Sequence, residues 1–113
     1  MHPFPPRLFT VALAAIVLLG AISRFTHGRY TPWFYEYQQD HRVDDGSSTA
    51  KTIPYVDTAL GILLLLRSTR LPAALVVAVS TIMGVVVQFE AEKSYGTDLI
   101  TLTIAALAVL EAL

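Results

Sequence analysis

Residues 71–89 read LPAALVVAVSTIMGVVVQF, and this stretch decides the fold because it contains no charged side chain over nineteen residues. A helix of about 20 apolar residues spans the hydrocarbon core of a bilayer. Similar stretches precede and follow it, at residues 8–25, 52–66 and 97–113. The sequence therefore predicts an all-α fold, an antiparallel four-helix transmembrane bundle in a single domain of residues 1–113.

Composition favours lipid as the solvent of this chain. Hydrophobic residues make up 54% of the 113 residues, charged residues only 15%, and the mean hydropathy is +0.56. The net charge of −1 provides no basic surface for nucleic acid. With no cysteine, disulfides and thiol chemistry are excluded. A cleaved signal peptide ending near residues 21–23 is the alternative interpretation of the first run, but an even bundle needs this span.

The connections predict how the helices meet. Residues 26–51 form a long loop, in which Thr31 and Pro32 begin a short helix that is rich in aromatic side chains and typical of the membrane interface. Thr52, followed by Ile53 and Pro54, is the predicted start of the second span. We expect Gly20, Gly61 and Gly84 to let helices approach closely, although such residues are also common in membrane helices.

The tight turn after the second span predicts the orientation. Arg67 and Arg70 lie there without an acid, which favours the cytoplasmic side for this turn and for the N-terminus with Arg7. Four basic residues at the end of the first span and in the long loop oppose this assignment: Arg24, Arg29, Arg42 and Lys51. We predict an integral, multi-pass membrane protein with cytoplasmic termini, in the endoplasmic reticulum if the cell is eukaryotic.

Four antiparallel crossings bring alternate helix ends together, and polar residues concentrate at one of the two ends. Asp57 lies about 8 Å inside its predicted span, where a carboxylate is costly unless it faces the bundle interior and has a partner such as Arg24 or His27. The alternative is a carboxylate near the headgroups, stabilised by the helix dipole. The predicted catalytic residues are Asp57, Glu90, Asp98 and Arg24.

Aromatic and amide side chains near the same end are candidates for binding a substrate. They are Tyr30, Trp33, Tyr55, Gln88 and His27. The simpler interpretation makes the aromatic residues a membrane-interface belt and the histidines interfacial. No span pairs histidine with a carboxylate three or four residues away, so no metal is predicted. Nucleophile motifs and glycine-rich phosphate loops are absent from the sequence, and we expect no cofactor.

The pattern resembles the DoxX-like family of small four-helix membrane proteins. The resemblance lies in LGAISRF at residues 19–25, DTALGILLLL at 57–66, the turn RSTRLP at 67–72 and GTDLI at 96–100. It covers nearly the whole chain. It implies the four-helix fold but no single activity, since members resemble accessory subunits, assembly factors and small enzymes of lipophilic natural-product pathways.

Two functions follow as hypotheses. The first is a membrane-embedded enzyme that opens an epoxide, by hydrolysis or cyclisation, in a lipophilic polyketide or terpenoid substrate. Asp57 would be the base, Glu90 or Asp98 the acid, and Arg24 an orienting charge. The second is a non-catalytic accessory subunit, chaperone or scaffold bound to a larger membrane or pathway protein; transport is a weaker third option.

Overall fold

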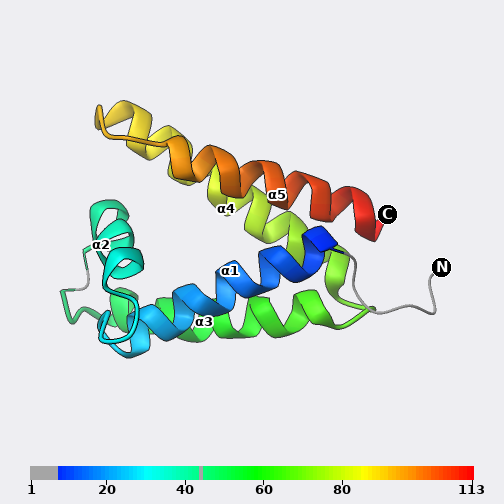
Figure 1. Ribbon diagram of the computed structural model, residues 1–113, viewed down its shortest axis with the longest axis horizontal. Helices are drawn as coiled ribbons and strands as arrows, with labels where there is room; N and C mark the ends of the chain where they lie inside the picture. The colour runs from blue at the N-terminus through cyan, green and yellow to red at the C-terminus, as the bar shows by residue number, and fades with distance from the viewer. Residues whose placement is uncertain (1–7, 44) are drawn as a thin grey trace.

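The computed structural model describes residues 8–43 and 45–113, and the regular secondary structure in this part of the chain is entirely α-helical. Its helices, shown in Figure 1, are α1 (Leu8–Phe25), α2 (Pro32–His41), α3 (Ser48–Leu65), α4 (Arg70–Glu90) and α5 (Gly96–Ala112). Arg7, which we predicted to lie on the cytoplasmic side, is outside the described residues. The all-α prediction and the short helix in the first loop are confirmed.

The four long helices form two pairs that diverge. Each long helix packs against two others, in the cyclic order α1, α3, α4, α5, and α2 packs on α1. Figure 1 shows neighbouring helices running in opposite directions, with the α1–α3 pair and the α4–α5 pair close together at one end and apart at the other. Helix α2 lies at the end where the pairs are apart.

Small residues explain why the pairs meet at one end. The buried core lies where α1 and α4 begin and α3 and α5 finish. Its members are Leu13, Ala14, Leu64, Ala73, Ala74, Val77, Ala105 and Ala108. Five of these eight are alanine, which lets helix backbones approach closely. Toward the other end small buried residues such as Ala21 and Ala50 lie on the α1–α3 pair, whereas α4 and α5 bury no small residue there, and the two pairs separate.

Two of the three glycines that we predicted to be at helix contacts do lie at one. A Cβ on Gly61 would overlap the side chain of Leu18 on α1, and a Cβ on Gly20 would lie 3.1 Å from the Gln38 amide on α2. A Cβ on Gly84 would have nothing within 4 Å. The packing prediction is therefore confirmed for Gly20 and Gly61 and wrong for Gly84, which lines a cavity instead.

Helix α3 begins earlier than we predicted. Ser47 is its N-cap, and its hydroxyl accepts a hydrogen bond from the Ala50 N–H at 3.1 Å. Thr52, the predicted cap, lies inside the helix and donates its hydroxyl to the Ser48 carbonyl at 2.7 Å. Asp57 consequently lies nine residues beyond Ser48, about 14 Å along the helix axis rather than 8 Å.

Side chains from neighbouring segments satisfy the helix ends at the closed end of the fold. The Glu111 carboxylate of α5 accepts from the N–H groups of Phe9 and Thr10, at 3.2 and 3.0 Å, and from the Thr10 hydroxyl at 2.9 Å. It therefore satisfies first-turn donors of α1 and complements the helix dipole. At the end of α3, Arg70 donates to the Leu64 and Leu65 carbonyls at 3.0 and 3.1 Å.

Two of the helices, α1 and α4, are long and apolar enough to cross a membrane. Helix α5 has 17 residues, about 26 Å at 1.5 Å per residue, and α3 carries Lys51 and Asp57. Of the most apolar stretch of α4, only 22% is buried within the protein, so most of this surface needs another apolar surrounding. These findings support membrane association, and the four crossings remain a prediction.

Replacing Glu111 with alanine should destabilise the fold, because two N–H groups and a hydroxyl in the first turn of α1 lose their acceptor. We expect the free energy of unfolding to fall by about 1–2 kcal/mol, measured by denaturant titration in mild detergent. Glu36→Ala is the control, since Glu36 is an exposed acid on α2. Equal stability of the two variants would contradict the capping role.

Gly61 and Gly84 provide a matched pair for the packing of the helices. Gly61→Ala should destabilise the protein because its Cβ meets Leu18, whereas Gly84→Ala should stabilise it by up to about 1 kcal/mol through helix propensity. The same denaturant titration measures both. Destabilisation by both alanines to the same extent would show that α1 and α3 do not approach as described.

Candidate functional site

Helix α2 occupies the open end of the fold. The chain leaves α1 through His27 and Gly28, both with positive φ (50° and 76°), and Gly28 donates its N–H to the Ser23 carbonyl at 2.9 Å. A Cβ on Gly28 would overlap the Tyr35 side chain, so glycine lets α2 fold back against the end of α1. Pro32 then starts α2 at its N-terminus.

Buried hydrogen bonds tie α2 to α1. The Gln38 amide donates to the Gly20 carbonyl at 3.0 Å. Arg24 donates from Nη2 to the carbonyls of Gln38 and Arg42, at 3.4 and 3.3 Å. Arg24 is only 7% exposed, so a residue that we predicted to be catalytic holds the last turn of α2 against α1.

Asp98, in the first turn of α5, ties α2 to the other helix pair. The Tyr37 hydroxyl donates to Asp98 Oδ1 at 2.5 Å, and His41 Nε2 lies 2.8 and 2.7 Å from Oδ1 and Oδ2 of the same carboxylate. Asp98 is buried, at 5% exposure. Burial, followed by the hydrogen bond to Asp98, raises the pKa of the Tyr37 hydroxyl well above its ordinary range, so Tyr37 remains a donor.

His41 and Asp98 form a polar pair beside the cavity. Nδ1 of His41 lies 2.9 Å from the Tyr37 carbonyl, and Nε2 lies within 2.8 Å of both Asp98 oxygens, so a hydrogen on either ring nitrogen finds an acceptor. A histidine that meets a carboxylate in this way is a candidate for proton transfer.

A second link joins α2 to the end of α4. The buried Gln88 amide donates to Asp40 Oδ2 at 2.8 Å and to the Ser94 carbonyl at 3.2 Å. Lys93 donates to the Asp40 carbonyl at 2.8 Å. Asp40 and Lys93 are each about half exposed, so their charge attraction contributes little, and Gln88 provides the buried part of this link.

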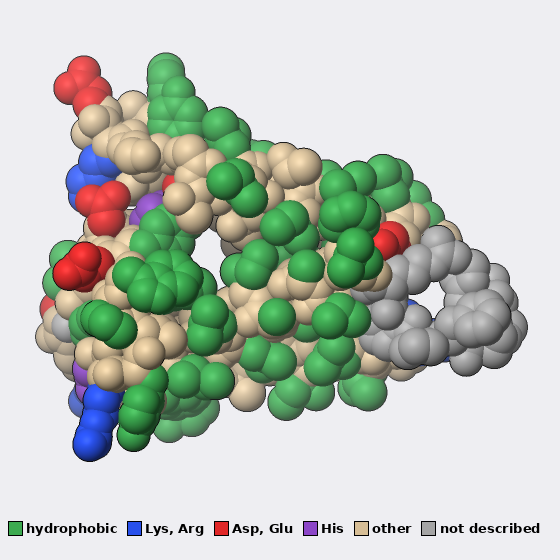
Figure 2. Space-filling model, viewed as in Figure 1, with side chains coloured by type: hydrophobic (Ala, Val, Ile, Leu, Met, Phe, Trp, Pro, Cys, Tyr) green, Lys and Arg blue, Asp and Glu red, His purple; other side chains and the backbone are tan. Residues whose placement is uncertain are grey.

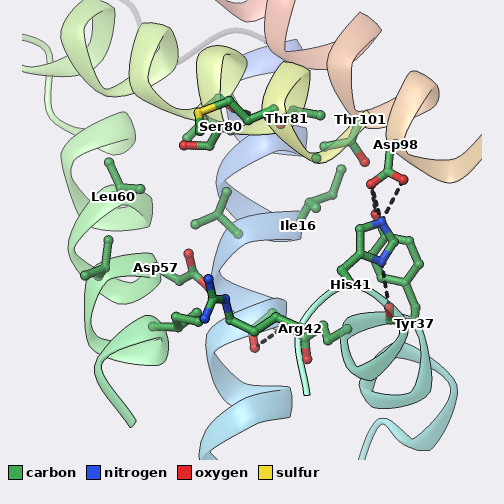
Figure 3. A pocket seen from close by; sticks show the side chains of 18 of the residues that line it. Ile16, Tyr37, His41, Arg42, Asp57, Leu60, Ser80, Thr81, Asp98 and Thr101 are labelled. Carbon is green, nitrogen blue, oxygen red and sulfur yellow. Dashed lines mark hydrogen bonds and ion pairs between the residues drawn. The ribbon is translucent and has the colours of Figure 1, made fainter. Parts of the chain in front are cut away.

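A cavity of about 940 Å³ lies between α2 and the four long helices, and it is open to the surface, because lining residues such as Val76 and Met83 are about half exposed. Its size suits a small organic molecule. Figure 2 shows an opening beside α2, with charged side chains gathered mostly at this end of the molecule. In Figure 3, Asp57 and Asp98 project toward the cavity from α3 and α5, on opposite sides of Ile16. Two acidic groups therefore face a space with mostly apolar walls.

Comparison of the chain with family models, curated proteins and solved structures found no match. The interpretation of the site therefore depends on its geometry.

The structure brings together part of the predicted catalytic set. Asp57 and Asp98 line the cavity, as does Gln88. Arg24 lies buried beneath α2 and is not among the lining residues. Glu90 is exposed and borders a separate hollow beside Glu92. Glu90, which we predicted to be catalytic, therefore lies away from the cavity, because α4 turns its Gln88 side inward and leaves Glu90 at the surface.

The aromatic candidates for substrate binding lie on the outside. Tyr30, Trp33 and Tyr55 are 66–70% exposed and do not line the cavity. His27 is also exposed, and its ring packs edge-on against Tyr35. Their positions agree with the simpler interpretation, an aromatic belt, and the substrate-lining role we considered for them is wrong. Gln88 is the predicted binding residue that reaches the cavity.

His41 and Tyr37 are functional candidates that lie outside the predicted catalytic and binding sets. They lie four residues apart and therefore share one face of α2, which was visible in the sequence. Their partner Asp98 is 57 and 61 residues away, respectively, and nothing local predicts that pairing. Arg42, the residue that directly follows α2, also lines the cavity.

Arg24→Gln should loosen α2, because the carbonyls of Gln38 and Arg42 lose a charged donor. We expect the free energy of unfolding to fall by about 2 kcal/mol and proteolysis within residues 26–47 to speed up. Arg29→Gln is the matched control, since Arg29 is exposed and stacks on Tyr30. If Arg24→Gln resists protease as well as Arg29→Gln does, Arg24 does not anchor α2.

Proposed function

We propose that the chain is a multi-pass membrane enzyme that performs cofactor-free acid–base chemistry, specifically epoxide opening, on a lipophilic substrate held in the cavity. The observation that carries this proposal is the pair of proton-handling groups on opposite walls of one largely apolar space: Asp57 on one side and His41 with Asp98 on the other. General acid–base catalysis requires such a separated pair.

Several features support four crossings. Large hydrophobic side chains are exposed along the outer faces of the long helices, among them Val79, Ile82 and Val86 of α4. Exposed apolar surface of this extent is stable in lipid and unfavourable in water. Tyr30, Trp33 and Tyr55 lie near the α2 end, where they would sit at headgroup level. The DoxX-like resemblance and the cytoplasmic termini stay predictions.

The proposed reaction balances without a cofactor. The nucleophile is water or a hydroxyl of the substrate itself, and it gives its proton to the Asp57 carboxylate. Its oxygen forms a bond to an epoxide carbon, while the bond from that carbon to the epoxide oxygen breaks. The epoxide oxygen takes a proton from the His41–Asp98 pair, and Asp57 later returns its proton through solvent. His41 with Asp98 thus replaces Glu90 as the acid.

The second candidate function is a non-catalytic accessory subunit or scaffold. The observation that favours it is the apolar outer face of α4, which could pack against a helix of a larger membrane protein. This function requires no cavity and no proton donor within it.

The test is turnover of two probes, a long-chain terminal epoxide and a long-chain epoxide that carries its own hydroxyl group, by the protein in lipid nanodiscs. Formation of diol reports attack by water, and formation of a cyclic ether reports attack by the internal hydroxyl. Asp57→Asn should lower turnover by about 100-fold or more, because the amide cannot accept the proton of the nucleophile.

Glu92→Gln is the control, because Glu92 is an exposed acid outside the cavity. Its turnover should equal that of the wild type. Equal turnover by wild type and Asp57→Asn would remove Asp57 from the mechanism. Recovery of the protein only in a stable complex with a larger membrane protein, with no turnover of either probe, would favour the accessory role.

A further inference from the structure

We propose that the cavity binds a single-chain amphiphile, which enters from the bilayer through a slot between α3 and α4 and lies with its polar end at α2 and its chain toward the closed end of the fold. Gly84 on α4 sets the width of this slot. The inference rests on the proposed function in treating the cavity as the place where the substrate binds. It adds to that function the class of the substrate and the route by which it arrives.

The exposed part of the cavity wall lies on two helices. The lining residues that α1, α2 and α5 contribute are buried or half-buried. Apart from Arg42, which follows α2, the exposed lining residues are Ser48, Thr49, Thr52 and Val56 on α3, and Val76, Ser80, Met83 and Val87 on α4. A tight turn at residues 66–69 joins these two helices, which belong to the pairs that diverge toward α2. The opening between them is therefore a slot that widens from that turn toward α2.

The slot opens beside the most apolar outer surface of the protein. The exposed lining residues of α4 recur every three or four positions and therefore form one stripe of that helix. On its neighbouring outer face, Val79, Ile82 and Val86 are exposed hydrophobic side chains. Only 22% of the most apolar stretch of α4 is buried within the protein. With lipid against this surface, a molecule dissolved in the bilayer reaches the slot without passing through water.

The walls of the cavity are polar at the α2 end. Arg42, Gln88 and the His41–Asp98 pair lie there. Toward the closed end the walls are mostly apolar, with Val17, Leu60, Val76 and Val77 among the lining residues. Ser80 and Thr81 also line this part, but the Thr81 hydroxyl already donates to the Val77 carbonyl at 2.7 Å. A ligand that suits both ends has one polar end and one apolar chain.

The length of the slot indicates the length of the chain. Val76 and Val87 lie eleven residues apart on α4, about 16 Å at 1.5 Å per residue. This is about half of the roughly 30 Å hydrocarbon core, the depth of one leaflet. The exposed Trp33 and Tyr55 near the α2 end suit headgroup level. An amphiphile bound with its polar end at α2 then has the orientation of the lipids in that leaflet, so it can enter without turning over.

Gly84 is the position at which the slot can be narrowed. It lines the cavity, and a Cβ added there would have nothing within 4 Å. A large side chain at this position therefore occupies space that the amphiphile needs. Val86, on the outer face of α4, is exposed and does not line the cavity. Gly84→Trp and Val86→Trp thus place the same ring at nearly the same depth, on the slot side and on the outer side of one helix.

The experiment is photolabelling of the full chain in phospholipid nanodiscs with two straight-chain primary alcohols, each about as long as a phospholipid tail. One carries a photoreactive diazirine beside the hydroxyl group, and the other carries the diazirine at the far end of the chain. Mass spectrometry of peptides identifies the labelled residues. The same alcohol without a diazirine, the plain alcohol, is the competitor.

The diazirine beside the hydroxyl group should label residues at the α2 end, such as Thr52 and Gln88, and the diazirine at the chain end should label Leu60 and Val77. The plain alcohol should suppress both signals. Gly84→Trp should lower the labelling of Leu60 and Val77 by about 10-fold or more, because the ring fills the slot. Val86→Trp should label as the wild type does.

Three results would overturn the proposal. Labelling of the same residues by both probes would remove the bound orientation. Phospholipid tails greatly outnumber the probe, so labelling that the plain alcohol does not suppress would show that the slot holds only bilayer lipid. Both results come from the wild type and stand even if Gly84→Trp does not fold. Equal labelling of the two folded tryptophan variants would remove the route through the slot.

Photolabelling involves no turnover, so the two proposals fail separately. The expected labelling pattern in a protein that opens neither epoxide probe would leave the binding site standing and remove the proposed reaction. Turnover that depends on Asp57, in a protein that both alcohols label at the same residues, would keep the reaction and remove the slot.

Discussion

The polar anchoring of α2 is the constraint on which the rest of the structure depends. At one end of the molecule, alanines let the long helices meet directly, and Glu111 joins the end of α5 to the start of α1. At the other end the two helix pairs diverge, and what joins them is one short helix. Gln38 bonds to α1, and Tyr37 and His41 bond to Asp98 on α5. These bonds hold the open end together without filling it.

This arrangement connects stability with chemistry. Helix α2 bridges the α1–α3 and α4–α5 pairs through the polar ends of its side chains. Space therefore remains between α2 and the long helices, and this space is the cavity. The residues that hold α2 to α5 are also the candidates for proton transfer. Asp57 faces the same space from α3, on the opposite side of the cavity. A proton donor and a proton acceptor are thereby kept apart, as a reaction between them and a bound substrate requires.

Much of the fold could be predicted from local sequence, and the site could be predicted only in part. The uncharged run predicted the helix that is α4, and Thr31 with Pro32 predicted the start of α2. Both signals lie in neighbouring residues, and both predictions are confirmed. The start of α3 was wrong because Ser47 caps the helix one turn before Thr52 can. The order of the helices was enough to predict that Asp57 and Asp98 lie at the same end of the fold. The side of α4 on which Glu90 is exposed, and the contact of His41 with Asp98, depend on tertiary packing and could not be predicted.

The most direct test of this account is the membrane side of three connections, since α2 can reach Asp98 only if the first loop and the α4–α5 connection lie on one face of the bilayer. Single cysteines at Arg29, Glu92 and Ser68 can be treated with a membrane-impermeant thiol reagent in sealed vesicles. The account predicts that the cysteines at positions 29 and 92 react from one side and that the cysteine at position 68 reacts from the other. Labelling of positions 68 and 92 from the same side would contradict it.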